Sequence, residues 1–305
     1  MARRTTSEEI LAELRAPLDE SPVRRIGVWS LEKLATLQLY LPAFARACQR
    51  AGGGYYVDGF AGPGRASVRG APEPYFVHGS PLIALRAKPE IERCIFLEID
   101  PHKLAALEGR CAHYGERALL RRGDVNVHLV PLLREEVPGW APCFCFLDPT
   151  GVELKWQTVA GIASLPGRRR KPELMILFPL EMSVIRLLTV DRPMRDEDKS
   201  RVNAMFKDES WWDVYQSRVR GEIDKAEAKR LYLAKYSQDV KDLGYESVES
   251  RQVLAYVGAG KKRQPRYHLV FATDHPVGED IMSGIFKRDF VLDLPVSRQP
   301  SLFDL

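Results

Sequence analysis

Residues 55–65 read Tyr-Tyr-Val-Asp-Gly-Phe-Ala-Gly-Pro-Gly-Arg, and this stretch decides the fold class. An apolar run with two tyrosines ends at Asp58, and glycines follow at positions 59, 62 and 64. Glycine adopts positive φ angles without steric cost, and it lets a bound ligand approach the backbone closely. A strand that ends in such a loop is typical of proteins that bind a nucleotide-like ligand beyond the strand.

Similar apolar runs follow along the chain, and each ends in an acidic residue or a proline. They cover residues 94–100, 119–124, 143–149 and 174–179. The segments 81–87 and 101–114 between them have the apolar spacing of helices. Apolar strands that alternate with helices predict an α/β fold with a mostly parallel sheet covered on both faces. Near the end, residues 252–257 and 266–272 predict a hairpin that would supply the last two strands.

Acidic residues lie at four of the predicted strand ends, namely Asp58, Glu98, Asp124 and Asp148. Ligands of parallel sheets bind beyond the carboxyl ends of the strands, and an acid on the second strand suits the paired hydroxyls of a ribose. An acid after a strand can also form a turn or cap the next helix. The spacing favours a ligand role for Asp58 and Glu98, whereas both interpretations stay open for Asp124.

The chain divides into five segments. We expect an N-terminal helix and linker at 1–25, a Rossmann-like cofactor-binding core at 26–182, a helical insertion at 183–245, a hairpin and helix that complete the core at 246–292, and a tail at 293–305. The opening, from Thr5 to Leu18, is expected to form a short amphipathic helix that ends near Pro17, with Ser7 as its cap.

The insertion carries strong helix formers at 223–236, with apolar positions spaced by three and four. Trp211 and Trp212, with Phe206 and Tyr215, could anchor this region against the body or form a surface for a substrate or partner. Packing is the favoured interpretation, because large aromatic side chains at helical spacing usually bury their area.

Composition is typical of a cytosolic globular enzyme. The 305 residues are 45% hydrophobic, enough for one large core. We find no apolar stretch long enough to span a bilayer and no signal-peptide core at the start, so we expect a cytoplasmic protein. The five cysteines lack metal-site spacing and indicate neither a disulfide framework nor a metal site.

The net charge of +4 is too small to identify a nucleic-acid-binding protein by itself. Two basic clusters, Arg168–Lys171 and Lys261–Arg263, are more suggestive, because basic loops can follow a phosphate backbone. A charge cluster is more often only a solvated surface, and the first cluster precedes a strand, at the edge opposite the predicted ligand site. Contact with nucleic acid is therefore an expectation that depends mainly on the fold.

Several motifs resemble the three-Cys-motif partner (TcmP) family, over roughly residues 26 to 290. They are Trp29-x-x-x-Lys33, Tyr40-Leu41, residues 56–64, Gly79-Ser80-Pro81-Leu82, Phe146-Leu147-Asp148-Pro149-x-Gly151-x-Glu153, residues 267–272 and Asp280-Ile281-Met282. The resemblance implies a Rossmann-like class I methyltransferase fold. It also implies a partner with three cysteines that resembles radical-SAM enzymes.

The resemblance to methyltransferases that use S-adenosylmethionine (SAM) assigns roles to single residues. Asp58, Gly59, Phe60, Gly62 and Gly64 match the loop that receives the methionine part and the ribose of SAM. Glu98 resembles the ribose-binding acid, and Asp124 matches the acid that hydrogen-bonds the adenine amino group.

Asp148-Pro149 matches the start of the motif with which enzymes that methylate amino groups of nucleic acids hold the acceptor. Thr150-Gly151 stand where that motif has a second proline and an aromatic residue. A stacking platform would have to come from elsewhere, and Trp156 is one candidate. Glu153 and Lys155 could act as acid, base or electrostatic groups, or they could simply be exposed residues at a helix start.

Two functions of different classes are therefore compatible with the sequence. The first is a SAM-dependent methyltransferase with Asp148 and Glu153 as catalytic candidates, and we expect it to act on nucleic acid together with the three-Cys partner. The second is a catalytically inactive adaptor of the same fold, which would bind nucleic acid or the bacterial sliding clamp. A dinucleotide oxidoreductase is a weaker third interpretation, because Pro63 interrupts the usual glycine spacing.

The last residues, Gln299-Pro300-Ser301-Leu302-Phe303, resemble the peptide with which bacterial replication and repair proteins bind the sliding clamp. Leucine and phenylalanine on a free tail can fill an apolar pocket, while glutamine adds hydrogen bonds. A tail that folds back on the protein is the alternative.

Overall fold

The structure is a computed structural model that describes residues 6–71, 73–257, 262–288 and 290. Its main sheet has seven strands in the order β6-β5-β2-β7-β8-β10-β9. The strands are β2 (Tyr55–Asp58), β5 (Arg93–Glu98), β6 (Ala118–Arg122), β7 (Cys143–Leu147), β8 (Glu173–Phe178), β9 (Ser247–Val257) and β10 (Lys262–Thr273). The first five are parallel, and β10 pairs antiparallel with both β8 and β9. The predicted α/β fold, a mostly parallel sheet with a C-terminal hairpin, is confirmed.

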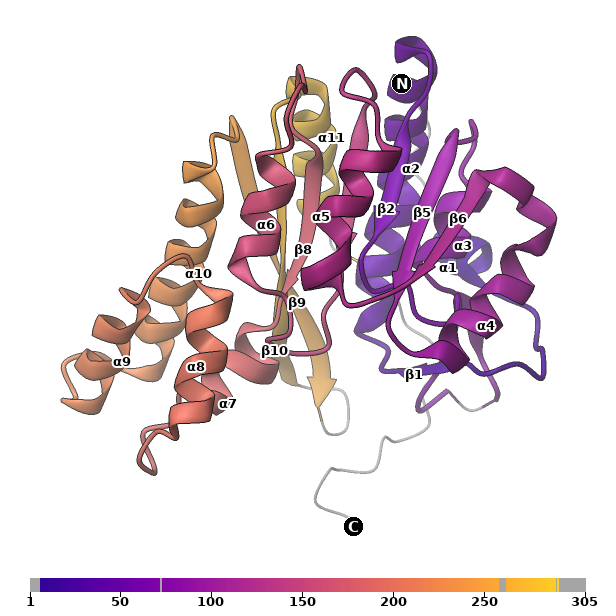
Figure 1. Ribbon diagram of the computed structural model, residues 1–305. Coiled ribbons are helices and arrows are strands. Elements are labelled where there is room, and N and C mark those ends of the chain that lie inside the picture. The colour runs from indigo at the N-terminus through magenta and orange to yellow at the C-terminus, as the bar shows by residue number, and fades with distance from the viewer. Residues whose placement is uncertain (1–5, 72, 258–261, 289, 291–305) are drawn as a thin grey trace.

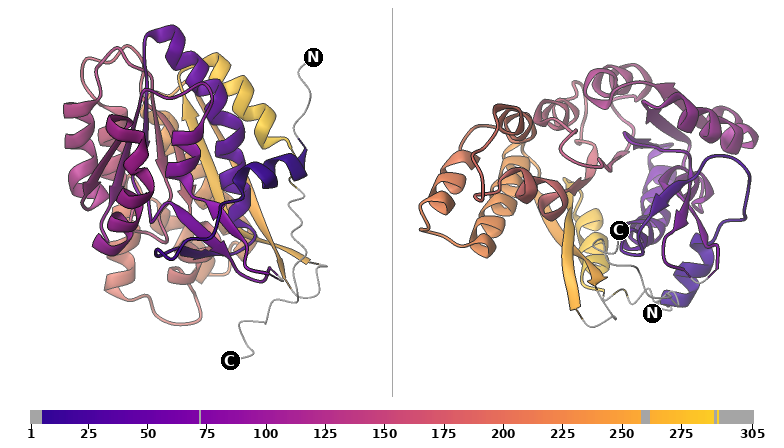
Figure 2. Two further views of the ribbon diagram at one scale, coloured as in Figure 1. Left: turned by 90° about the vertical axis from the view of Figure 1, so that its right-hand side faces the viewer. Right: turned by 90° about the horizontal axis from the view of Figure 1, so that it is seen from below.

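Helices cover both faces of this sheet (Figures 1 and 2). They are α1 (Ser7–Leu14), α2 (Ser30–Ala51), α3 (Ser80–Arg86), α4 (Pro101–Cys111), α5 (Val125–Glu136), α6 (Trp156–Ala163), α7 (Ile185–Leu187), α8 (Asp196–Met205), α9 (Trp211–Val219), α10 (Lys225–Asp242) and α11 (Pro276–Phe286). Because side chains alternate along a strand, each face of the sheet has its own core. Val57 packs with α5 and α6 on one face, and Tyr56 packs with α2, α3 and α11 on the other.

The chain order places a topological switch point at the centre of the sheet. From β2 the chain continues to β5 and β6 on one side, and then returns to β7 and β8 on the other side. Ligands of open α/β sheets bind at such a point, beyond the carboxyl ends of the strands. This edge is the lower one in Figure 1.

A second, three-stranded sheet lies at that edge and was not predicted. It consists of β1 (Arg24–Ile26), β3 (Arg65–Val68) and β4 (Phe76–His78), in the order β1-β3-β4. These strands have three or four residues each and mixed polarity, so they lack the continuous apolar signal of buried strands. The sheet connects the N-terminal segment to the glycine loop, because β3 begins directly after Gly64.

The aromatic residues of the insertion pack inward. Trp211 is fully buried, and Phe206 and Tyr215 are buried with it in the core of the α5–α6 face. The favoured packing interpretation is thus confirmed for these three residues. The insertion, α8 to α10, lies at the β9 end of the sheet (Figure 1).

The predicted bounds of the first helix were wrong. Thr6, not Ser7, is the cap, since its side chain accepts from the Glu9 backbone and the Glu9 side chain accepts from the Thr6 backbone. The helix ends at Leu14, because Arg15 and Ala16 leave it to pair with β4. Within the described part of the chain, no helix is long and apolar enough to cross a membrane.

Candidate functional site

Three of the four predicted acids lie buried at the carboxyl edge of the main sheet. Asp58 ends β2, Glu98 ends β5, and Asp148 follows β7. Their exposed fractions are 0%, 7% and 4%. Ionisable side chains are seldom this buried without partners, so the contacts of each one show what holds it there.

Glu98 holds the glycine loop. The Gly62 N–H donates to Glu98 Oε2 at 2.8 Å, and the Asp100 N–H donates to Oε1 at 2.9 Å. Each carboxylate oxygen can accept a further hydrogen bond. The carboxylate is therefore held in a fixed orientation at the edge of the sheet, with acceptor capacity left for a ligand.

Gly62 is the glycine that leaves space for a ligand. Its φ angle is +62°, a conformation that favours glycine, and a Cβ atom built on it would meet no atom within 4 Å. The two other predicted glycines are needed for packing instead. A Cβ on Gly59 would approach Leu147 to 2.9 Å, and one on Gly64 would approach Leu107 to 2.7 Å. Close ligand approach is thus supported at Gly62 only.

Phe60 has a structural role in the same loop. Its backbone N–H donates to Asp58 Oδ1 at 3.1 Å, and its half-buried side chain packs against the α5–α6 core. The Tyr56 hydroxyl lies 3.3 Å from Asp58 Oδ2. Burial raises the pKa of Asp58 to about 7, against the hydrogen bonds from Ser80 and Phe60 that lower it.

The raised pKa of Asp58 predicts a pH dependence of stability. An acid with a raised folded-state pKa binds its proton more tightly in the folded protein. Its contribution to stability is therefore full below the unfolded value of 3.8 and is lost as the pH rises through about 7. The free energy of unfolding of the wild type, measured with urea, should fall between those pH values by up to ~4 kcal/mol relative to Asp58→Asn. Parallel curves for the two proteins would contradict this burial effect.

Asp148 forms a buried ion pair that the sequence did not predict. The Lys33 ammonium, on α2, donates to Asp148 Oδ2 at 2.5 Å, and Arg24 Nη1, on β1, donates to the same oxygen at 3.2 Å. The Lys33 side chain is only 7% exposed. Burial lowers the pKa of Lys33, and the negative charge of Asp148 opposes that shift.

The other oxygen of Asp148 has no such partner. Asp148 Oδ1 is buried and accepts no hydrogen bond from any described residue. A buried acceptor without a partner is costly, and such atoms in folded proteins usually point to a bound water, an ion or a ligand. The acid thus has one oxygen fixed by two cations and one oxygen available.

Asp124 and Glu153 stabilise their own local turns. Asp124 caps α5, and its Oδ1 accepts from the Asn126 backbone at 2.8 Å. Glu153 is exposed and accepts from the Gly151 N–H at 2.5 Å. These contacts agree with the structural interpretation of both residues. The adenine role of Asp124 and the catalytic role of Glu153 stay predictions.

Trp156 does not provide a stacking surface. It is 8% exposed and packs edge-on against Tyr236 in the core. The proposal of Trp156 as a base platform is therefore wrong. Two other aromatic residues lie near Lys33: the buried Tyr267 ring, 6.0 Å from its Nζ, and Trp29, whose carbonyl accepts from the Tyr267 hydroxyl.

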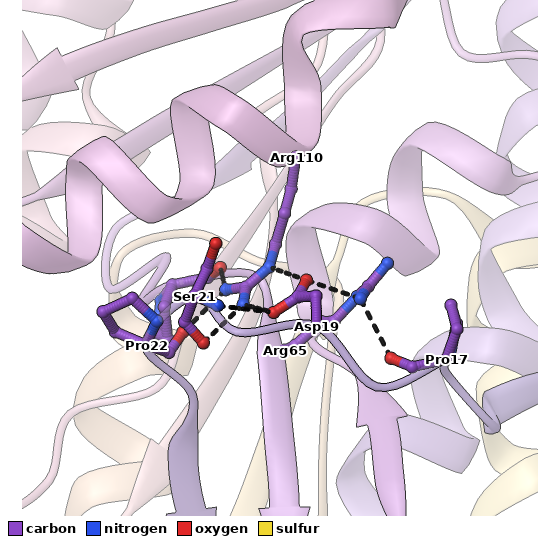
Figure 3. Close-up of polar contacts among 7 residues, drawn as sticks. Pro17, Asp19, Ser21, Pro22, Arg65 and Arg110 are labelled. Atoms are coloured by element: carbon purple, nitrogen blue, oxygen red, sulfur yellow. Dashed lines mark hydrogen bonds and ion pairs between the residues drawn. The ribbon is translucent and has the colours of Figure 1, made fainter.

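An N-terminal segment, residues 17–22, is fixed beside the glycine loop (Figure 3). The Arg110 guanidinium, 5% exposed, donates to Asp19 and to the carbonyl of Pro63 in the loop. Arg65 also donates to Asp19, at 2.5 Å. The hydrogen bond and charge of Arg110 lower the pKa of Asp19. Asp19 thereby joins the segment that leads to Arg24 with the loop that carries Gly62.

Comparison by sequence gives no relatives, since no family model matches this chain and no curated protein matches it. Comparison by structure gives matches at low identity. A protein from Legionella pneumophila matches with a TM-score of 0.49, 10% identity, and coverage of 83% of this chain and 89% of that one. The METTL16 methyltransferase domain matches with a TM-score of 0.43 and 10% identity, over 80% of this chain and 68% of that one. A SAM-dependent methyltransferase from Aquifex aeolicus matches with a TM-score of 0.36 and 13% identity, over 81% of this chain and 97% of that one. At such scores the likeness concerns the path of the chain, and a function must come from the residues at the sheet edge.

Proposed function

We propose that this protein is a SAM-dependent methyltransferase that acts on nucleic acid. The observation that carries the proposal is the pairing of Gly62 with Glu98 at the switch point of the sheet. Gly62 leaves open space in a left-handed turn, and Glu98 is buried and oriented with acceptor capacity on both oxygens. These residues fit a ribose, whose two hydroxyls need a fixed carboxylate beside a backbone that can be approached closely.

When bound, SAM supplies a methyl group on a positively charged sulfur, and the protein's own task is positioning. Asp148 would hold the acceptor. Its Oδ1 is buried and unpartnered among the described residues, so it can accept a hydrogen bond from an N–H or O–H group of the substrate. Lys33 and Arg24 fix the orientation of the carboxylate through Oδ2. Of the three acids, Glu98 would contribute most to the negative charge that suits a sulfonium ion, because Asp148 is paired with two cations and burial raises the pKa of Asp58 to about 7.

The three-Cys partner belongs to the same proposal and is supported by the TcmP motifs at Trp29–Lys33 and 146–153. One of these motif residues, Lys33, holds the central acid in place. Nucleic acid as the acceptor is supported by the resemblance of Asp148-Pro149 to the amino-methylating motif.

An adaptor without transfer activity is the second candidate. It is favoured by Thr150-Gly151, which remove the usual aromatic residue, and by the burial of Trp156. Transfer of a tritiated methyl group from SAM to bulk RNA and DNA, with and without the three-Cys partner, separates the two. Incorporation that Asp148→Asn reduces at least ~100-fold supports the enzyme. SAM binding with no incorporation into either polymer supports the adaptor.

The peptide 299–303, which resembles the clamp-binding motif, and the tip of the basic hairpin, 258–261, lie outside the described residues. We propose clamp binding as a further partner interaction. The double variant Leu302→Ala/Phe303→Ala should lose recovery of purified sliding clamp in a pull-down, because both pocket-filling side chains are gone. The control is Ser301→Ala in the same peptide. Equal recovery with the double variant and with the control would rule out the motif.

A further inference from the structure

Glu181 is a buried carboxylate at the same edge of the sheet that the proposed mechanism does not use. It lies in a π-helical turn, Leu180–Val184, directly after β8. Because β7 and β8 are neighbouring parallel strands, this turn lies next to the segment that carries Asp148. The Glu181 side chain is 8% exposed.

Neither oxygen of Glu181 accepts a hydrogen bond from the described residues. The nearest cationic atoms are Lys229 Nζ at 3.6 Å and His268 Nε2 at 3.7 Å, and both face Oε1. These distances are too long for hydrogen bonds, although charges at this separation still attract. Both oxygens are thus buried acceptors without a hydrogen bond from the described residues, and they remain for a donor from outside the protein.

A cavity of about 390 Å³ opens at this carboxylate. It is lined by Glu181, Ile185, Arg186, Thr189, Lys225 and Lys229. Three cationic side chains thus line the same cavity as Glu181, and one of them, Lys229, forms an ion pair with its carboxylate. Neither Arg186 nor Lys225 has a hydrogen bond or ion pair with any residue that the structure describes. Both are exposed, and they can therefore turn toward a ligand without breaking a contact.

The chemistry of this cavity favours a ligand that combines an anion with a hydrogen-bond donor. Lysine and arginine bind phosphate oxygens, and a buried carboxylate accepts from an amino or hydroxyl group. A nucleotide unit has a phosphate together with base amino and sugar hydroxyl groups. A free anion alone would meet the repulsion of Glu181, and a simple cation would meet three positive charges.

We infer that the cavity at Glu181 binds one nucleotide unit of the methyl acceptor, a single-stranded nucleic acid. Lys225, Lys229 and Arg186 contact its phosphate, and Glu181 accepts from an N–H or O–H of the same unit. This inference rests on the proposed function and extends that function, because it places the acceptor strand on the β8 side of Asp148. The cofactor residues Gly62 and Glu98 lie on the β2–β5 side.

The test is binding of a short fluorescein-labelled RNA strand of mixed sequence, followed by fluorescence anisotropy over a range of salt concentrations. For single strands, each lost phosphate contact reduces the slope of log K against log salt by ~0.7. The double variant Lys225→Ala/Lys229→Ala should lower the slope by ~1.4 and weaken binding about 25-fold at ~0.1 M salt. The matched control is Lys207→Ala/Lys241→Ala, which removes the same charge at the other end of α10. Lys241 lies in the last turn of that helix, and Lys207, from the segment before α9, forms an ion pair with Asp242 there.

A slope that falls equally in the variant and the control would overturn the inference, because overall charge would then explain binding. The variant Glu181→Gln tests whether this carboxylate accepts a hydrogen bond from the strand. It should alter the ratio of the affinities for RNA and DNA, or the ratio of the affinities for strands with different bases. If all these ratios are unchanged, Glu181 does not contact the strand. SAM affinity, measured by calorimetry, should be equal in all these variants. If the wild type does not bind SAM, the proposed function is wrong. The salt slopes of the variants then still show whether the cavity at Glu181 binds a nucleic-acid strand.

Discussion

Replacing Gly62 by valine should abolish SAM binding, with affinity reduced at least ~100-fold below the micromolar value expected for the wild type. The space beside the Gly62 Cα is open, and a valine side chain would occupy it where the cofactor is expected to approach. The variant Glu98→Ala should reduce SAM affinity by a similar factor. It removes two expected charge-assisted hydrogen bonds to the ribose, which contribute ~1.5–3 kcal/mol each. Calorimetric titration of SAM into purified protein measures both.

Valine at a positive φ angle is strained wherever it occurs, so the control must share that strain. Gly221 provides it, with a φ angle of +72° and no atom within 4 Å of a built Cβ, in the insertion away from the loop. Gly221→Val should bind SAM as the wild type does. If both valine variants lose binding together, strain explains the result. If Gly62→Val binds normally, Gly62 does not face the cofactor.

The strands of the main sheet could be predicted because buried parallel strands are continuous apolar runs, as in residues 143–147. The position of Glu98 at a strand end followed from the same pattern. The glycine pattern was less informative, since glycines needed for packing and for ligand access look alike in a sequence. Only the contacts distinguish Gly62 from Gly59 and Gly64.

The partners of Asp148 could not be predicted from spacing. Lys33 lies 115 residues and Arg24 lies 124 residues before it, and each is placed by a different element. One signal was present, because Lys33 occupies a position among the apolar residues of α2, with Leu31 and Leu34 beside it. A lysine on the buried face of a helix indicates a buried partner of opposite charge, but it does not name that partner.

Asp148→Ala should destabilise the fold by ~3–5 kcal/mol, because it leaves the Lys33 ammonium buried with no close counter-ion. Asp148→Asn keeps an oxygen acceptor for Lys33 and should cost less, which makes it the better variant for testing catalysis. The double variant Lys33→Met/Asp148→Leu should regain most of the loss, since a buried ion pair can be replaced by apolar side chains of similar size. Urea unfolding followed by circular dichroism gives each free energy, and the double-mutant cycle isolates the coupling.

The exposed pair Arg220–Glu222 is the control for this cycle. Its atoms approach to 2.6 Å, close to the 2.5 Å of Lys33–Asp148, but both side chains are more than half exposed. Glu222→Ala should therefore leave the free energy of unfolding nearly unchanged, because exposed pairs are screened by water. A similarly small effect of Asp148→Ala would mean that Lys33 reaches solvent, and that Asp148 is free to hold an acceptor with both oxygens. A large effect, with methyl transfer absent from the stable Lys33→Met/Asp148→Leu protein, would show that Lys33 and Asp148 serve the reaction and not the fold alone.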